Sequence, residues 1–380
     1  MILGKGTKSP IALQLKSVFN RLFITFVTWY RKKQMKKLRL LLLPFSWLYG
    51  AILFFRHFIY DRGFANSYGF DKPVIVIGNL VLGGAGKSPM TEYLLRLFAG
   101  VSIATLSRGY GRKSTGYLEV QGGSTAEKVG DEPLQFKRKF PGVTVAVCED
   151  RVEGLRQLMP SHDIFVLDDA FQHRRLKPGI SILLFDFESL QENKWVLPAG
   201  NYRDLFMRRN FADIIVITKS PEALSKTDRQ RCLQLLKLER ELPTFFSYIE
   251  YGDLVNLMTD EKESFPINAR LIVMTGIANP TSFCNYLTTK GNVLKMIEFP
   301  DHHRYTAGDL LKIKRYWQSL GDCLIVTTEK DAMRLRDPEL RSHIEDLPLH
   351  YIPIETKFHH NASGPSFDNL IKDQVFGKQV

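Results

Sequence analysis

The stretch Val74-Ile-Val-Ile-Gly-Asn-Leu-Val-Leu-Gly-Gly-Ala-Gly-Lys-Ser-Pro89 decides the fold. Its four apolar β-branched residues, Val74–Ile77, predict a buried strand, and the glycine-rich loop that follows ends in Gly86-Lys87-Ser88. Apolar residues between Tyr93 and Phe98 predict an amphipathic helix directly after the loop. A strand, such a loop and a helix in this order bind phosphate, because loop N–H groups and the helix N-terminus both point at the anion.

The predicted phosphate-binding residues are those of the loop and the first helical turn: Val81, Leu82, Gly83, Gly84, Ala85, Gly86, Lys87 and Ser88. Lys87 can reach the β- and γ-phosphates, and the Ser88 hydroxyl can bind Mg²⁺. Val81 stands where the strict pattern has its first glycine. The alternative is a glycine turn beside a surface lysine, which leaves the flanking strand and helix unexplained. The sequence therefore predicts a nucleoside triphosphate site.

Composition and charge narrow the class of protein. A chain of 380 residues with 44% hydrophobic and 24% charged residues can fold into two globular domains. Its four cysteines are far apart in sequence, which predicts a reducing compartment without disulfides or a structural zinc site. Eleven basic and no acidic residues lie in residues 1–60, so residues 61–380 carry only +1 of the net charge of +12. This distribution argues against a nucleic-acid partner.

The basic N-terminal segment is also apolar. Residues 40–55 (LLLLPFSWLYGAILFF) contain no charge, whereas six Lys or Arg residues lie just before them and Arg56 follows. As a helix these residues would span about 24 Å, less than the ~30 Å of a bilayer's hydrocarbon core. We therefore expect a membrane-associated helix within residues 35–70, lying in the plane or partly inserted; a core helix of a soluble domain is the alternative. Residues 1–34 form a basic extension that we interpret as a start-site artefact or a dispensable segment, because Met35 would be a natural chain start.

After Asp71 short β-rich runs alternate with helical stretches, a pattern that predicts parallel α/β sheets. The fold class expected is α/β, with a P-loop NTPase-type parallel sheet domain and a smaller C-terminal α/β domain. We place the first domain at residues 71–255, a polar linker at 256–268 and the second domain at 269–380. Nucleotide would bind at the carboxyl ends of the first domain's strands.

A second motif supplies carboxylates. Ile164-Phe-Val-Leu167 predicts a strand that ends in Asp168 and Asp169, the Walker B arrangement that holds Mg²⁺. Adjacent strand residues face opposite ways, so both carboxylates can serve one metal only if the strand ends there and the chain turns. The alternative is a pair of turn residues that cap the next helix.

Three further polar clusters follow predicted strands. Arg108 and Arg112, in Ser-Arg-Gly-Tyr-Gly-Arg, could contact a phosphate or shape a substrate opening, or simply form a basic turn. Asp131 of Gly-Asp-Glu-Pro suits a helix N-cap, which the residues alone favour. His302 lies in Pro-Asp-His-His, where an acidic residue and two histidines are candidates for acid/base chemistry.

Taken together, these motifs resemble the tetraacyldisaccharide 4′-kinases, the lipid A 4′-kinases of Gram-negative bacteria. The similarity runs from about Leu38 to about Ile354, and ten motifs occur in the family's order: LLLPFSWLYG, GNLVLGGAGKSP, LSRGYGR, GDEP, LDDAFQHR, LPAGNYRD, VITK, TGIANP, PDHH and TTEKDA. Val81 also fits, since this family commonly lacks the first Walker glycine. The departures are small: Ala170 replaces a common glycine, and the loop up to Asp204 differs in three residues.

The resemblance implies an ATP- and Mg²⁺-dependent kinase of lipid A (lipopolysaccharide) biosynthesis, which phosphorylates the 4′-hydroxyl of tetraacyldisaccharide 1-phosphate to give lipid IVA. It implies a peripheral or monotopic protein on the cytoplasmic face of the inner membrane, with a lipid substrate and no obligate protein partner. Asp131 would be the base, paired with His302, and Lys87 would neutralise developing charge. Family membership thus reverses the N-cap preference for Asp131.

Under the same resemblance Ser88, Asp168 and Asp169 would hold Mg²⁺, and Arg108 and Arg112 would contact substrate. The main alternative is a membrane-associated P-loop ATPase switch, although such switches usually have a lysine early in the loop, where this chain has Val81 and Leu82.

Overall fold

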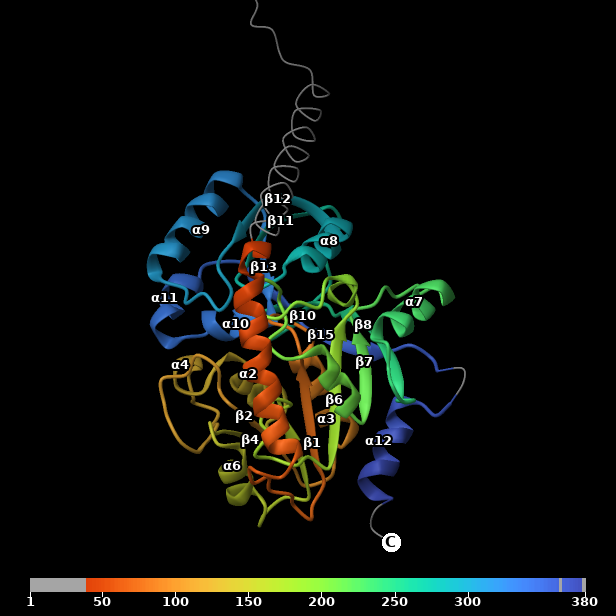
Figure 1. The fold of residues 1–380 in the computed structure, drawn as a ribbon. Coiled ribbons are helices and arrows are strands. Elements are labelled where there is room, and N and C mark those ends of the chain that lie inside the picture. Colours follow the sequence, from red (N-terminus) through yellow and green to blue (C-terminus); the bar gives the residue numbers. More distant parts are fainter. Residues whose placement is uncertain (1–38, 362–363, 378–380) are drawn as a thin grey trace, which may run out of the picture. The chain divides into compact units, whose positions relative to one another are not determined.

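The computed structural model describes residues 39–361 and 364–377 (Figure 1). The predicted extension over residues 1–34, the start at Met35 and most of the basic cluster lie outside these residues. The described chain divides into two compact units. The smaller consists of residues 39–56 and Asn193–Leu205, and the larger contains the rest.

The larger unit contains a nine-stranded sheet in the order β15-β8-β7-β6-β1-β5-β2-β4-β3. The seven inner strands are parallel, and the two edge strands, β15 and β3, are antiparallel to their neighbours. The strands are β1 (Val74–Asn79), β2 (Ile103–Ser107), β3 (Leu118–Glu119), β4 (Thr144–Val147), β5 (Ile164–Leu167), β6 (Ile180–Asp186), β7 (Ile214–Thr218), β8 (Thr244–Tyr251) and β15 (Ile354–Phe358). Strands β1, β2, β5 and β7 are buried along their whole length, as expected for a sheet covered on both faces.

Helices cover both faces of this sheet because its strand residues alternate between two cores. Ile75 and Ile77 pack in the same core as α3 (Lys87–Leu97) and α12 (Phe367–Phe376). Val74 and Val76 face the other way and share a core with α6 (Arg151–Leu158). The remaining helical elements here are α4 (Ala126–Val129), α5 (Asp131–Lys139), α7 (Lys226–Leu236), η2 (Ser189–Gln191) and η3 (Phe206–Phe211).

The same unit contains a second, six-stranded sheet in the order β10-β9-β14-β13-β11-β12. Its strands are β9 (Leu254–Asn256), β10 (Lys262–Glu263), β11 (Ala269–Thr275), β12 (Gly291–Glu298), β13 (Leu324–Thr328) and β14 (Leu349–Ile352). Its helical elements are α8 (Thr281–Lys290), α9 (Ala307–Leu320), α10 (Glu329–Leu335), η4 (Pro338–Leu340) and α11 (Arg341–Ile344). Helices α9 and α8 pack in separate cores on opposite faces of β11 (Figure 1).

The predicted fold class, a mixed α/β protein with a large parallel sheet and an apolar N-terminal helix, is confirmed. The boundaries at residues 71, 256 and 269 stay predictions, but the sheets cross them at two places. β10 lies within the expected linker and pairs with β9. β15 and α12 return to the first sheet, where β15 pairs with β8 in antiparallel register.

In the smaller unit the loop Asn193–Leu205 is hydrogen-bonded to the N-terminal helical residues. After η1 (Leu40–Leu42), helix α2 runs from Leu43 to Asp61, and its residues up to Arg56 belong to this unit. The Ser46 hydroxyl donates to the Val196 carbonyl at 3.0 Å and accepts from the Ala199 N–H at 2.9 Å. Arg39, expected in the basic membrane-facing cluster, donates instead to the loop carbonyl of Pro198 at 3.0 Å.

A buried charge network joins the helices of the two sheets in the larger unit. The Lys139 ammonium lies 2.7 Å from Glu92 on α3 and 3.0 Å from Glu329 on α10. The Gln135 amide donates to the same two carboxylates, at 2.7 and 3.3 Å. One ammonium thus faces two buried carboxylates. Burial, together with the charge of Glu92, raises the pKa of Glu329 to about 7.

We predict that Glu329→Gln makes unfolding less dependent on pH. Because the folded-state pKa of Glu329 lies above its unfolded value of about 4.3, folding takes up a proton, so wild-type stability falls as the pH rises from about 4.5 to 7. The amide cannot ionise, so across this pH window the free energy of unfolding of the variant should rise relative to that of wild type by roughly 1–3 kcal/mol. Urea unfolding at pH 5 and pH 8 measures the difference, with Glu345→Gln, on an exposed side chain, as control. Parallel pH profiles for Glu329→Gln and wild type would contradict the prediction.

Candidate active site

The glycine-rich loop lies between the end of β1 at Asn79 and the start of α3 at Lys87. Gly86 adopts φ +82°, a left-handed conformation that favours glycine, and it leaves the first turn of α3 without a side-chain cap. The N–H groups of that turn therefore remain available to an anion, and the helix dipole favours one there. Thr218 at the end of β7 fixes the loop, since its hydroxyl donates to the Ala85 carbonyl at 2.9 Å.

The predicted phosphate-binding lysine is held between two polar groups. The Lys87 ammonium donates to the Asn79 amide oxygen at 3.3 Å and lies 3.7 Å from an Asp169 carboxylate oxygen. Its side chain is 15% exposed. Asp169 adopts φ +50° just beyond the end of β5, so the strand ends and the chain turns, as a shared carboxylate site requires.

Three carboxylates surround the first turn of α3. The Ser88 hydroxyl, which is buried, donates to Glu132 at 2.5 Å, and Glu132 also pairs with Lys330 of α10. Asp168, 1% exposed, accepts a long hydrogen bond of 3.4 Å from Thr91. Burial and the neighbouring charges of Glu132 and Asp169 raise the pKa of Asp168 well above its usual range. Burial also acts to raise the pKa of Glu132, but Lys330 lowers it below its usual range.

This crowding of negative charge fits a divalent cation. Among residues 39–361 and 364–377 no group of three His, Cys, Asp or Glu side chains could chelate a metal alone. Mg²⁺ rarely needs such a cage, because it usually takes one or two carboxylates and completes its shell with water and substrate phosphates. The Ser88 hydroxyl and the carboxylates of Asp168 and Asp169 are suitable donors of this kind.

A second cluster lies around the carboxylate of Asp131, the first residue of α5. His302 Nδ1 lies 3.0 Å from Asp131 Oδ2, and Arg334 Nε donates to the same oxygen at 2.7 Å. Burial alone would raise the pKa of Asp131, but the hydrogen bond to His302 and the charge of Arg334 lower it overall, so the carboxylate stays ionised.

The residues around Asp131 also correct its expected role as an N-cap. The N-cap of α5 is Gly130, and no side chain caps this helix. Gly130 adopts φ +95°, and a Cβ there would lie 3.2 Å from the backbone of Gly109. This close approach brings the loop after β2 to the start of α5, and the Tyr110 ring lies 5.2 Å from the His302 ring.

The two arginines of that loop lie in different surroundings. Arg108 is exposed. Arg112 donates to the Glu149 carboxylate at 2.6 Å and to the Gly116 carbonyl at 2.7 Å, so its guanidinium already has partners within the protein. The proposed substrate contact of both residues stays a prediction.

Three residues of these clusters were not predicted as site residues: Glu132, Lys330 and Arg334. Glu132 and Lys330 stand inside motifs that the sequence shows, GDEP and TTEKDA. Arg334 follows Lys330 by four residues, so both lie on one face of α10. That spacing could have predicted that both side chains face the same neighbour, but no pattern in the sequence shows which helix this face of α10 contacts.

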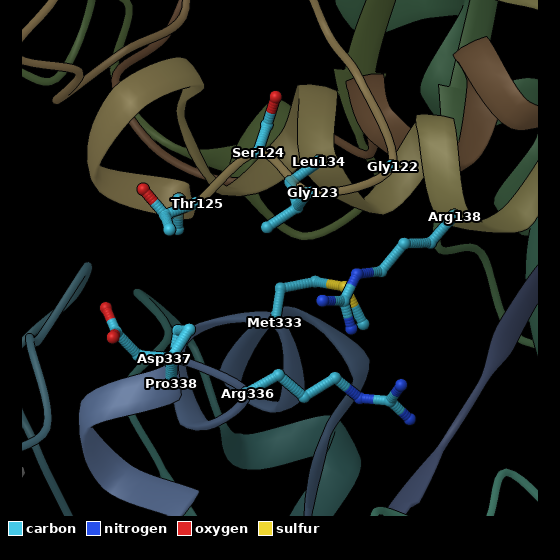
Figure 2. A pocket seen from close by; sticks show the side chains of 11 residues that line it. Gly122, Gly123, Ser124, Thr125, Leu134, Arg138, Met333, Arg336, Asp337 and Pro338 are labelled. Atoms are coloured by element: carbon cyan, nitrogen blue, oxygen red, sulfur yellow. The ribbon is translucent and has the colours of Figure 1, made fainter.

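A separate small pocket lies between the loop at residues 122–126 and the end of α10 (Figure 2). The guanidinium groups of Arg138 and Arg336 line it together with the apolar side chains of Leu134 and Met333. Arg336 is paired with Asp260 there, with 2.9 Å between Nη1 and Oδ2. None of the predicted site residues lines this pocket.

Comparison with known proteins identifies the family. The family model described as Tetraacyldisaccharide-1-P 4′-kinase matches residues 38–375. The chain belongs to this family. Tetraacyldisaccharide 4′-kinases of Flavobacterium johnsoniae and Bacteroides thetaiotaomicron are 41% and 39% identical to it. The first alignment covers 85% of this chain and 94% of the relative, and the second covers 87% and 92%.

A solved structure shares the fold. The crystal structure of an "apo" form of LpxK from Aquifex aeolicus in complex with ATP aligns with a TM-score of 0.70 and 30% identity, covering 89% of this chain and 100% of that chain. The predicted family and enzyme class, a kinase, are thereby confirmed. The roles of individual side chains in this tetraacyldisaccharide 4′-kinase family member stay predictions.

We predict that Asp168→Asn weakens Mg²⁺ binding without lowering the stability of the metal-free protein. The amide removes one of three crowded negative charges, so the metal-free variant should melt at the wild-type temperature or higher. Its affinity for Mg²⁺ in the presence of ATP should fall by roughly 10- to 100-fold. Thermal unfolding during Mg²⁺ titration measures both effects, and Asp163→Asn, on an exposed carboxylate beside Lys72, is the control. Wild-type Mg²⁺ dependence in the Asp168 variant would exclude this carboxylate from the metal site.

Proposed function

We propose that this chain transfers the γ-phosphoryl group of ATP to the 4′-hydroxyl of tetraacyldisaccharide 1-phosphate, which gives lipid IVA. The observation that carries the proposal is the pair of adjacent carboxylates at the start of α5. Glu132 accepts a hydrogen bond from Ser88 of the phosphate loop, while Asp131 contacts His302. Asp131, a candidate base for an acceptor hydroxyl, is therefore the chain neighbour of a residue that contacts the predicted phosphate site.

ATP would bind along the loop from Val81 to Ser88, with its phosphates at the uncapped N-terminus of α3. That the Aquifex aeolicus relative was crystallised in complex with ATP supports ATP as the nucleotide. Lys87 would lie against the β- and γ-phosphates, since its ammonium is partly buried near Asn79 and Asp169. A fixed positive charge at that position stabilises the charge that develops on the transferred group.

Ser88, Asp168 and Asp169 would hold Mg²⁺. The chemistry supplied by a cation held there would be positive charge that offsets the negative charge of the phosphates. The protein's own part is to keep Ser88 and Asp168 buried beside a second carboxylate, and the raised pKa of Asp168 reflects that burial and that neighbouring charge.

Asp131 would accept the hydrogen bond of the 4′-hydroxyl and orient its oxygen toward the γ-phosphorus. A bond then forms between that oxygen and phosphorus, the bond from phosphorus to the β–γ bridging oxygen breaks, and ADP leaves. The transition state of phosphoryl transfer is loose, so the acceptor proton is lost late and a weakly basic carboxylate suffices. His302, 3.0 Å from Asp131, would fix the carboxylate and share the proton.

We also propose that the protein binds the inner membrane from its cytoplasmic side through α2. The helical span Leu40–Asp61 is long and apolar enough to cross a membrane, which by itself is weak evidence. Eleven large apolar side chains of this span are exposed, and six of them recur at helical spacing along one stripe: Leu41, Phe45, Leu48, Ile52, Phe55 and Ile59. At the other end of the helix Asp61 accepts from Arg208 at 2.9 Å and pairs with Arg174, contacts that favour a helix lying on the membrane over one that spans it.

The kinase proposal predicts that Asp131→Asn and His302→Ala lower kcat by roughly 100- to 10,000-fold and leave the KM for ATP nearly unchanged. The assay follows γ-labelled phosphate from ATP into detergent-solubilised tetraacyldisaccharide 1-phosphate. His343→Ala, on a histidine of α11 outside the two clusters, is the control. If wild type hydrolyses ATP without phosphorylating the lipid, the membrane-associated ATPase switch becomes the better account.

The membrane proposal predicts that Leu48→Glu with Phe55→Glu weakens vesicle binding by about tenfold or more, because two exposed apolar side chains no longer enter the lipid. Sedimentation with vesicles containing anionic lipid measures binding. Leu311→Glu, on an exposed leucine of α9, is the matched control. Equal sedimentation of the double variant and wild type would exclude the α2 stripe as the docking surface.

A further inference from the structure

Arg334 on α10 lies at the centre of the Asp131 cluster. Its guanidinium is almost fully buried, with 6% of the residue exposed. Nε donates to Asp131 Oδ2 at 2.7 Å, and Nη1 donates to the carbonyl of Gly276 at 2.9 Å. Nη2 lies 3.3 Å from His302 Nδ1. The three nitrogens of one planar group therefore face α5, the end of β11 and the His302 loop.

The guanidinium is itself held by a buried carboxylate. Asp331, fully buried and one helical turn earlier, accepts from Arg334 Nη1 at 2.9 Å. The same carboxylate accepts from the Tyr305 hydroxyl at 2.9 Å, the Gly276 N–H at 3.0 Å and the Thr328 hydroxyl at 2.7 Å. Because these donors come from three different segments, the plane of the Arg334 guanidinium is fixed before any substrate binds.

We propose that Arg334 is a positioning residue for phosphoryl transfer, and that it acts through Asp131 and His302. It fixes which Asp131 oxygen faces His302 and leaves the other oxygen for the acceptor hydroxyl. This inference rests on the proposed function of Asp131 as the group that orients that hydroxyl. A lysine cannot replace Arg334, because one ammonium on a flexible stem cannot reach Asp131, Gly276 and His302 in the geometry of a planar fork.

The test compares Arg334→Lys and Arg334→Ala with wild type in the lipid phosphorylation assay. Both variants should lower kcat by roughly 100-fold or more while the KM for ATP stays within about twofold, because Arg334 contacts neither the loop 80–86 nor α3. Guanidinium ion at millimolar concentration should restore part of the activity of Arg334→Ala. Arg336→Ala, two residues further on and paired with Asp260, is the control and should keep wild-type kcat.

The lysine variant retains the charge and most of the buried stem, so it keeps the proposal falsifiable if the alanine variant does not fold. A folded Arg334→Lys with wild-type kcat overturns the inference. A second readout adds Arg334→Lys to Asp131→Asn: no further loss supports action through Asp131, and an additive loss overturns it. Failure of wild type to phosphorylate the lipid would instead overturn the proposed function.

Discussion

The two carboxylates at the start of α5 constrain the rest of the structure. Asp131 and Glu132 are neighbours in the chain, yet Glu132 contacts the first turn of the phosphate-loop helix and Asp131 contacts the second sheet's His302 loop and α10. Two half-buried negative charges on one helical turn are stabilised by positive partners. α10 supplies both, Lys330 to Glu132 and Arg334 to Asp131. The ion pairs that hold α5 of the first sheet against α10 of the second sheet therefore involve the same carboxylates as the candidate active site.

A third charged group extends this arrangement. Lys139, at the other end of α5, binds Glu92 of α3 and Glu329 of α10, so the same three helices meet again away from the candidate site. Buried ion pairs add little net stability, because desolvation offsets their attraction, but they penalise any packing that separates the partners. We interpret this network as the feature that fixes the register of α3, α5 and α10.

Local chemistry explains what the sequence predicted. The sequence predicted two features: the strand, loop and helix around Lys87, and the strand that ends before Asp168. Both depend on residues close together in the chain, so they could be predicted from local patterns. β15 falls within the expected second domain but pairs in the first sheet; its sequence showed no sign of this, because it is a partly exposed edge strand directly after Pro353, with polar residues between its apolar ones. Arg334 and Glu132 were missed as site residues because their roles come from contacts with partners 203 and 44 positions away. For Asp131 the residues alone favoured a cap; the resemblance to a family reversed that preference, and the structure places Gly130 at the N-cap.

The most direct test of the account is calorimetric titration of MgATP into Asp131→Asn and Glu132→Gln. If the two carboxylates serve different partners, Asp131→Asn binds MgATP with an affinity within about twofold of wild type, whereas Glu132→Gln, which loses the charged acceptor of Ser88, binds roughly tenfold or more weakly. Equal affinities of the two variants, or weaker binding by the Asp131 variant alone, would contradict the division of roles on which the account rests.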